Sequence, residues 1–151
     1  MSDSYLKIIP TQPDYMPSQQ AQERLPDLLK ALVPRAENVD VVAHDEVGFV
    51  DQGENFDSVA CPHCKQALDM EWWQDAMGAA SEKGFSDLAV HLPCCRTNIS
   101  LNDLDYRMPA GFARFVIEVR NPERDDVLDA HAIAELRDVI GAPIRQIFAR
   151  Y

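Results

Sequence analysis

Four cysteines, the only ones in the chain, constrain its fold more than any other feature of the sequence. Cys61 and Cys64 belong to a CPHC motif, whose two-residue gap lets two thiolates bind one metal ion, and Cys94 and Cys95 are adjacent. In a reducing compartment such cysteines are more often metal ligands or redox groups than disulfides. The sequence therefore predicts a metal site or a redox site in the middle of the chain.

A structural zinc site is the first expectation for these cysteines. A CxxC turn points both of its thiolates to one side, whereas adjacent residues on an extended chain point to opposite sides. Cys94 and Cys95 can therefore share a metal only if the chain turns tightly there, which the preceding Pro93 favours. The expected ligands of a structural Zn²⁺ ion are Cys61, Cys64, Cys94 and Cys95.

Two alternatives to that ligand set stay open. His91 lies shortly before Cys94, and it can complete a set of three thiolates and one imidazole if one of the adjacent cysteines points away. Without a metal, Cys61 and Cys64 could form a redox pair, a motif that in thioredoxin-like proteins opens a helix after a buried strand. A full set of four protein ligands leaves no room for a substrate, so it favours a structural role over metal catalysis.

The pattern of apolar residues predicts an α+β fold in a single domain, residues 1–151, with a mixed, mostly antiparallel sheet and about three helices. Helices are expected at residues 18–33 and 69–83, and a third ends at Gly141. A zinc ribbon-like knuckle is expected as an insertion at about residues 58–106, clamping the middle of the chain to its C-terminal half. Alternating apolar and polar side chains predict strands at residues 5–9, 38–43, 47–50, 55–60, 87–92, 112–120 and 144–151.

The same pattern predicts three further details: a turn, a crossover unit and the exposure of one tryptophan. Residues 44–46 are expected at a tip that joins two short strands. Residues 112–120 alternate as a strand with one buried and one mostly wet face, and with the next helix and strand they suit a crossover unit with parallel strands. Trp72 lies about 100° around its helix from Trp73, so one narrow buried stripe does not easily take both rings, and one ring is expected near the surface.

Acidic residues are concentrated in one part of the chain, whose formal net charge is −11. Residues 36–64 contain seven acids and no Lys or Arg. Such a field repels nucleic acid and attracts cationic partners, although acidity also serves solubility alone. We predict a basic protein partner and no nucleic acid, and the residues expected at the contact are Asp45, Glu46, Asp51, Glu54, Asp57 and Trp72.

Catalytic and membrane motifs are not visible in the sequence. There is no GxSxG motif and no glycine-rich phosphate loop, so no nucleophile with its base can be named. No apolar run approaches the roughly 20 residues of a membrane span, and the first residues lack the basic flank and apolar run of a signal peptide. The sequence therefore predicts a cytoplasmic protein without a membrane partner.

The segment SLNDLDYRMPAGFARFVIEVRNP, with CPHC, PCC and DQGENF upstream of it, resembles a group of bacterial proteins of about this length. The resemblance covers most of the chain. It implies a single bacterial domain with a metal knuckle, and it brings no activity and no catalytic residue.

Three functions are compatible with these observations. The first is a non-enzymatic, zinc-stabilised acidic protein that neutralises or regulates a basic protein partner, as a bacterial toxin-immunity protein does. The second is an enzyme that uses the cysteine cluster as an open metal site or as a redox pair. The third is a zinc-stabilised structural subunit.

Overall fold

The largest sheet of the protein has four antiparallel strands, and they come from the first and last thirds of the chain. In the computed structural model, which describes residues 3–123 and 128–151, the strands lie in the order β2-β7-β1-β8. β1 is antiparallel to β7 and β8, and β7 is antiparallel to β2. The strands are β1 (Ser4–Pro10), β2 (Asn38–Val50), β7 (Gly111–Arg120) and β8 (Ile144–Arg150).

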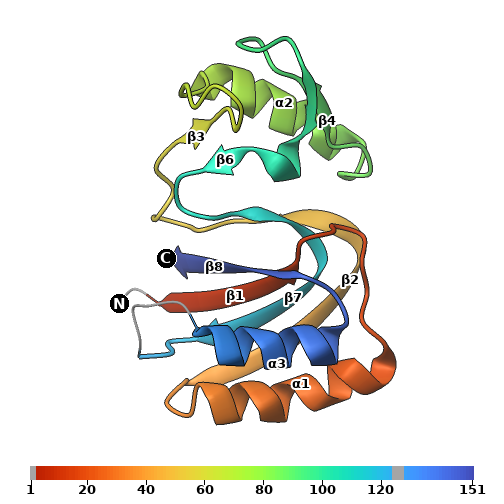
Figure 1. The fold of residues 1–151 in the computed structure, drawn as a ribbon, viewed down its shortest axis with the longest axis vertical. Coiled ribbons are helices and arrows are strands. Elements are labelled where there is room, and N and C mark those ends of the chain that lie inside the picture. Colours follow the sequence, from red (N-terminus) through yellow and green to blue (C-terminus); the bar gives the residue numbers. More distant parts are fainter. Residues whose placement is uncertain (1–2, 124–127) are drawn as a thin grey trace.

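Two helices, α1 (Gln19–Leu32) and α3 (Ala130–Ile140), cover one face of this sheet (Figure 1). In each of the units β1-α1-β2 and β7-α3-β8 the two strands are parallel, and a strand of the other unit lies between them. This is the split βαβ arrangement of ferredoxin-like folds. The expected crossover unit with parallel strands is therefore present, and β1 lies between its two strands.

The helices form where the sequence predicts them. Ser18 caps α1 by accepting a hydrogen bond from the N–H of Ala21 (3.2 Å), and α1 continues through Pro26 as one helix. Gly141 ends α3 in the left-handed conformation, with φ of 86°. The apolar faces of both helices bury a core against the sheet, made by Leu6, Ile8, Leu25, Leu29, Val33, Phe115, Ile117, Val119, Leu128, Ala132, Leu136 and Ile140.

A second lobe is inserted between β2 and β7, on the side of the sheet opposite the two helices (Figure 1). We call its residues 59–106 the cysteine lobe. Its apolar core also takes in Phe112 of β7, and Val47 and Phe49 of β2 pack against it. Two small antiparallel sheets, β3-β6 and β4-β5, flank one helix. The elements are β3 (Val59–Ala60), α2 (Met70–Glu82), β4 (Ala89–His91), β5 (Asn98–Ser100), the short 3₁₀-helix η1 (Leu101–Asp103) and β6 (Asp105–Tyr106).

The structure corrects three details of the expected strands. Residues 44–46 do not form a tip between two strands, because β2 runs unbroken from Asn38 to Val50 with an irregular register between Ala43 and Gly48. The strand expected at residues 55–60 is reduced to β3. The second face of β7 is not mostly wet: Val116 is buried there with Ile9, Val50, Ala113 and Ile147, because both faces of this central strand are covered.

The two tryptophans of α2 are both half-buried, so the expectation of one surface ring is not met. The indole N–H of Trp73 donates to the hydroxyl of Tyr106 (3.3 Å), and the Trp73 ring packs against Phe49 and Phe56. Trp72 packs against the same core. Both rings are covered because α2 packs against residues of β2 and of the segment after it as well as against the cysteine lobe.

Asn102, buried in the cysteine lobe, fastens that lobe to the sheet. Its side-chain N–H donates to the C=O of Thr11 (2.8 Å), and its side-chain oxygen accepts from the N–H of Phe112 (3.0 Å) and from Arg145 (3.1 Å). The same guanidinium nitrogen of Arg145 donates to the C=O of Ala110 (2.8 Å). This buried network sets the position of the lobe on the sheet. No helix in the described parts of the chain is long and apolar enough to cross a membrane.

Candidate metal centre

The four cysteines meet at one point of the cysteine lobe. Their Sγ atoms all lie within 4.8 Å of one another, and those of Cys61 and Cys95 are 3.7 Å apart. None of the four is in a disulfide. Cys61 is buried and Cys95 half-buried, whereas Cys64 and Cys94 are exposed. The cluster is therefore close enough to hold a metal ion.

The cluster is formed by two turns with the same backbone hydrogen bond. In the first turn the N–H of Lys65 donates to the C=O of Cys61 (2.9 Å), and in the second the N–H of Arg96 donates to the C=O of Leu92 (2.9 Å). Lys65 and Arg96 both adopt positive φ, 66° and 53°. In both turns a proline follows the first residue. The chain therefore builds the same knuckle twice.

The cysteines occupy different positions in these two knuckles. The first supplies its thiols from the first and fourth positions, as a CxxC motif does, but the second supplies them from the third and fourth. Its first position is Leu92, which is fully buried in the apolar core of the lobe. The tight turn brings the adjacent cysteines to the same site, as the sequence required. The matched pairs are Cys61 with Leu92, His63 with Cys94, and Cys64 with Cys95.

The thiols differ in their electrostatic surroundings. The Sγ of Cys61 accepts the backbone N–H groups of Cys64 (3.5 Å) and His63 (3.4 Å). The hydrogen bond from Cys64 is the main cause that lowers the pKa of Cys61 to about 6, against the opposing effect of burial. Hydrogen bonds with the thiols of Cys64 and Cys61, together with burial, raise the pKa of Cys95 to about 12. The surroundings thus favour the thiolate at Cys61 and the neutral thiol at Cys95, which must lose its proton when a metal binds.

Two alternatives and one expected role of the cluster do not fit this geometry. His91 lies in β4 outside the cluster, exposed, with its Nδ1 3.1 Å from the side-chain oxygen of Asn98. Cys61 opens a turn after β3 and not a helix, unlike the thioredoxin-like arrangement. Both knuckles belong to the cysteine lobe, so the cluster joins two parts of this lobe and does not clamp the middle of the chain to its C-terminal half.

Moving the thiol of Cys94 to the position of Leu92, the first position of the second knuckle, tests whether the two knuckles are equivalent. We expect Cys94→Ser, which removes an exposed ligand, to weaken metal binding by about 100-fold. The double variant Leu92→Cys with Cys94→Ser is expected to regain most of that loss, because it recreates a CxxC knuckle. Competition with a chromophoric chelator measures both affinities. Equal affinities for the single and double variants would contradict the match.

The acidic residues of the predicted partner contact lie at separate places on the protein. Asp51 is bound to Lys7, whose Nζ is 3.3 Å from the carboxylate, and it also accepts from the Tyr151 hydroxyl (2.8 Å). Glu54 and Asp57 are exposed on the segment that leads into the cysteine lobe. Asp45 and Glu46 lie in the irregular part of β2, where they line a cleft.

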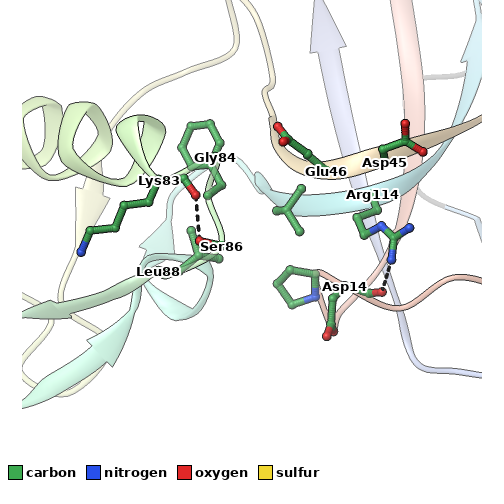
Figure 2. Close-up of a pocket in the computed structure, with 11 residues that line it drawn as sticks. Asp14, Asp45, Glu46, Lys83, Gly84, Ser86, Leu88 and Arg114 are labelled. Atoms are coloured by element: carbon green, nitrogen blue, oxygen red, sulfur yellow. Dashed lines mark hydrogen bonds between the residues drawn. The ribbon is translucent and has the colours of Figure 1, made fainter.

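This cleft, of about 520 Å³, lies between β2, the loop after β1 and the loop after α2 (Figure 2). Arg114 of β7 holds two of its walls, because its guanidinium donates to the C=O groups of His44 (3.3 Å) and Asp14 (3.5 Å). Asp14 and Arg114 are far from the acidic stretch in the sequence, and no motif marks them. The lining residues are Pro13, Asp14, Asp45, Glu46, Val47, Lys83, Gly84, Phe85, Ser86, Leu88 and Arg114.

Comparison with known proteins finds no matching family model, no similar curated protein and no similar solved structure. The geometry of the cysteine cluster and of the cleft therefore carries the functional argument.

Proposed function

We propose that this protein binds one structural Zn²⁺ ion through Cys61, Cys64, Cys94 and Cys95, and that it is a non-enzymatic binding protein for a basic protein partner. The cysteine cluster carries the proposal. Zinc in structural sites takes four ligands in a tetrahedron at about 2.3 Å from each sulfur, which places the sulfurs about 3.8 Å apart. The 3.7 Å between Cys61 and Cys95 agrees with that spacing.

Four protein thiolates fill a tetrahedral site, so such a zinc ion has no position left for a substrate. Its role is to hold together the two knuckles of the cysteine lobe, whose strands are only two or three residues long. Thiolate ligands favour soft or borderline metals such as zinc over magnesium or calcium. These points favour a structural ion over a catalytic one.

Two properties favour a basic partner: the negative net charge of the chain, and exposed carboxylates that have no hydrogen bond or ion pair. Among the described residues, the carboxylates of Asp45 and Glu46 form no hydrogen bond or ion pair, and those of Glu54 and Asp57 likewise form none. All four are exposed. Unpaired surface carboxylates attract a cationic protein from a distance, and salt weakens that attraction.

Capture of partners at low salt, from the native lysate of the source cells, tests this function. We expect the wild-type protein to retain a basic protein and the variant D45N/E46Q/E54Q/D57N to lose it. When the complex is re-formed from purified components, its Kd is expected to rise at least about fivefold between 50 and 200 mM salt.

A matched control neutralises the same number of exposed carboxylates elsewhere. The variant E23Q/D27N/E82Q/D138N changes the net charge equally and is expected to keep the partner. If no basic protein is retained at low salt, or if both variants lose it equally, the proposal of a basic partner is wrong. Metal content is measured on the same samples, so the zinc site is tested separately.

A further inference from the structure

We propose that the cleft between β2 and the cysteine lobe receives a cationic side chain, arginine or lysine, of the basic partner. This inference rests on the proposed function, and it assigns the contact with the basic partner to the cleft. The cleft lies where the two lobes face each other, a preferred location for binding sites, and its volume of about 520 Å³ is within the usual range for them.

The lining of the cleft suits the stem of a long cationic side chain. Four apolar residues contribute to it, and they come from three separate segments of the chain. Arginine and lysine bury their methylene groups along such surfaces while the charged end reaches a polar group. The four apolar residues are Pro13, Val47, Phe85 and Leu88.

Unpaired carboxylates are available to the charged end. Asp14, Asp45 and Glu46 line the cleft, and within the described residues their carboxylates accept no hydrogen bond and form no ion pair. Elsewhere in residues 36–64, Glu37 accepts from Asn121 (2.5 Å) and Asp51 is bound to Lys7. The acids that remain free and lie in a concave place are therefore those of the cleft.

In the described residues, neither cation of the lining forms an ion pair with these carboxylates. Lys83 points away from the cleft in Figure 2, and its Nζ lies 3.7 Å from the carboxylate of Asp87. The guanidinium of Arg114 donates to two backbone C=O groups, and the backbone N–H of Arg114 donates to the C=O of Pro13 (3.0 Å). Arg114 is thus a positioning residue that holds the loop after β1 beside β2.

A separate feature also favours a cation at the cleft. Helix α2 ends at Glu82, so the residues that follow it place the negative end of the helix dipole beside the cleft. Glu46 reaches across from β2 toward this end (Figure 2), and a Cβ built on Gly84 would lie 3.4 Å from its carboxylate oxygen. A cation beside Glu46 and the end of α2 would be attracted by both.

Titration of the ¹⁵N-labelled, metal-loaded protein with N-acetyl-arginine methylamide tests the cleft. We expect saturable chemical-shift changes at the amides of Glu46, Gly84 and Phe85, and none from the neutral glutamine analogue. Glu46→Gln is expected to weaken binding about 3- to 10-fold, and Asp14→Asn similarly. Asp138→Asn, a change of equal charge outside the cleft and outside the proposed contact, is expected to leave the affinity unchanged.

Shifts that are equally large with the glutamine analogue, that are spread over the exposed acids, or that persist in Glu46→Gln would overturn the inference. The same variants are then tested with the captured partner. If the partner binds in a salt-sensitive way but Glu46→Gln has no effect, the proposed function stands and the cleft is wrong. If no basic partner is captured at all, the proposed function fails, whatever the arginine analogue shows.

Discussion

Replacing Cys61 by serine is expected to abolish zinc binding and to unfold the cysteine lobe, while the four-stranded sheet stays folded. Cys61 is fully buried, and two backbone N–H groups donate to its sulfur. Metal binding is worth on the order of 10 kcal/mol to a structural site of this type. The short strands of the lobe offer little to replace that contribution, since isolated two-stranded pairs are marginally stable in water.

The sheet is expected to survive because its apolar core, formed with α1 and α3, shares no buried residue with the core of the cysteine lobe. Metal analysis and an amide NMR spectrum measure the two effects together. Amides of β1 and α3 are expected to keep their dispersed shifts, while those of α2 and β4 collapse toward unfolded positions. A chelator added to the wild-type protein is expected to give the same spectrum.

His63→Ala is the matched control for this variant. His63 lies inside the same knuckle, but its side chain is exposed and outside the cysteine cluster, so metal content and spectrum are expected to stay as in the wild type. Full zinc content and an unchanged lobe in Cys61→Ser would show that Cys61 is not a ligand. Collapse of the whole spectrum would show that the two cores do not fold separately.

Asn102→Ala is expected to lower the free energy of unfolding by about 2–4 kcal/mol, because it removes three hydrogen bonds that its buried side chain makes. These are the C=O of Thr11, the N–H of Phe112 and the guanidinium of Arg145. Arg145 keeps the C=O groups of Ala110 and Asn102 as acceptors, but burial lowers its pKa, so the loss of one acceptor adds to the cost.

Denaturant unfolding measures this loss, and Asn98→Ala serves as its control. Asn98 belongs to the same lobe and its side chain contacts His91, but it is exposed, so its removal is expected to cost less than about 0.5 kcal/mol. A loss for Asn102→Ala as small as that of Asn98→Ala would mean that the network does not hold the lobe on the sheet.

The sequence determined the local elements with strong periodicity or clear caps. Ser18 and Gly141 mark helix ends in the sequence and in the structure, because a cap depends only on residues within one turn of the helix. The two turns that carry the cysteines are local in the same way, whereas their meeting at one site was expected only from the preference of zinc for four ligands. A CxxC turn is local, and a tight turn is the one way for adjacent cysteines to reach the same site.

Only the tertiary structure decided which strands are neighbours and where the functional surfaces lie. The order β2-β7-β1-β8 brings together strands from both ends of the chain, and the pattern within β7 does not reveal that both of its faces are covered. Nor does the sequence show that Asp14 and Arg114 meet Glu46 across a cleft. Periodicity and capping follow from interactions between residues a few positions apart, whereas strand order and clefts follow from packing between distant segments, which no local pattern records.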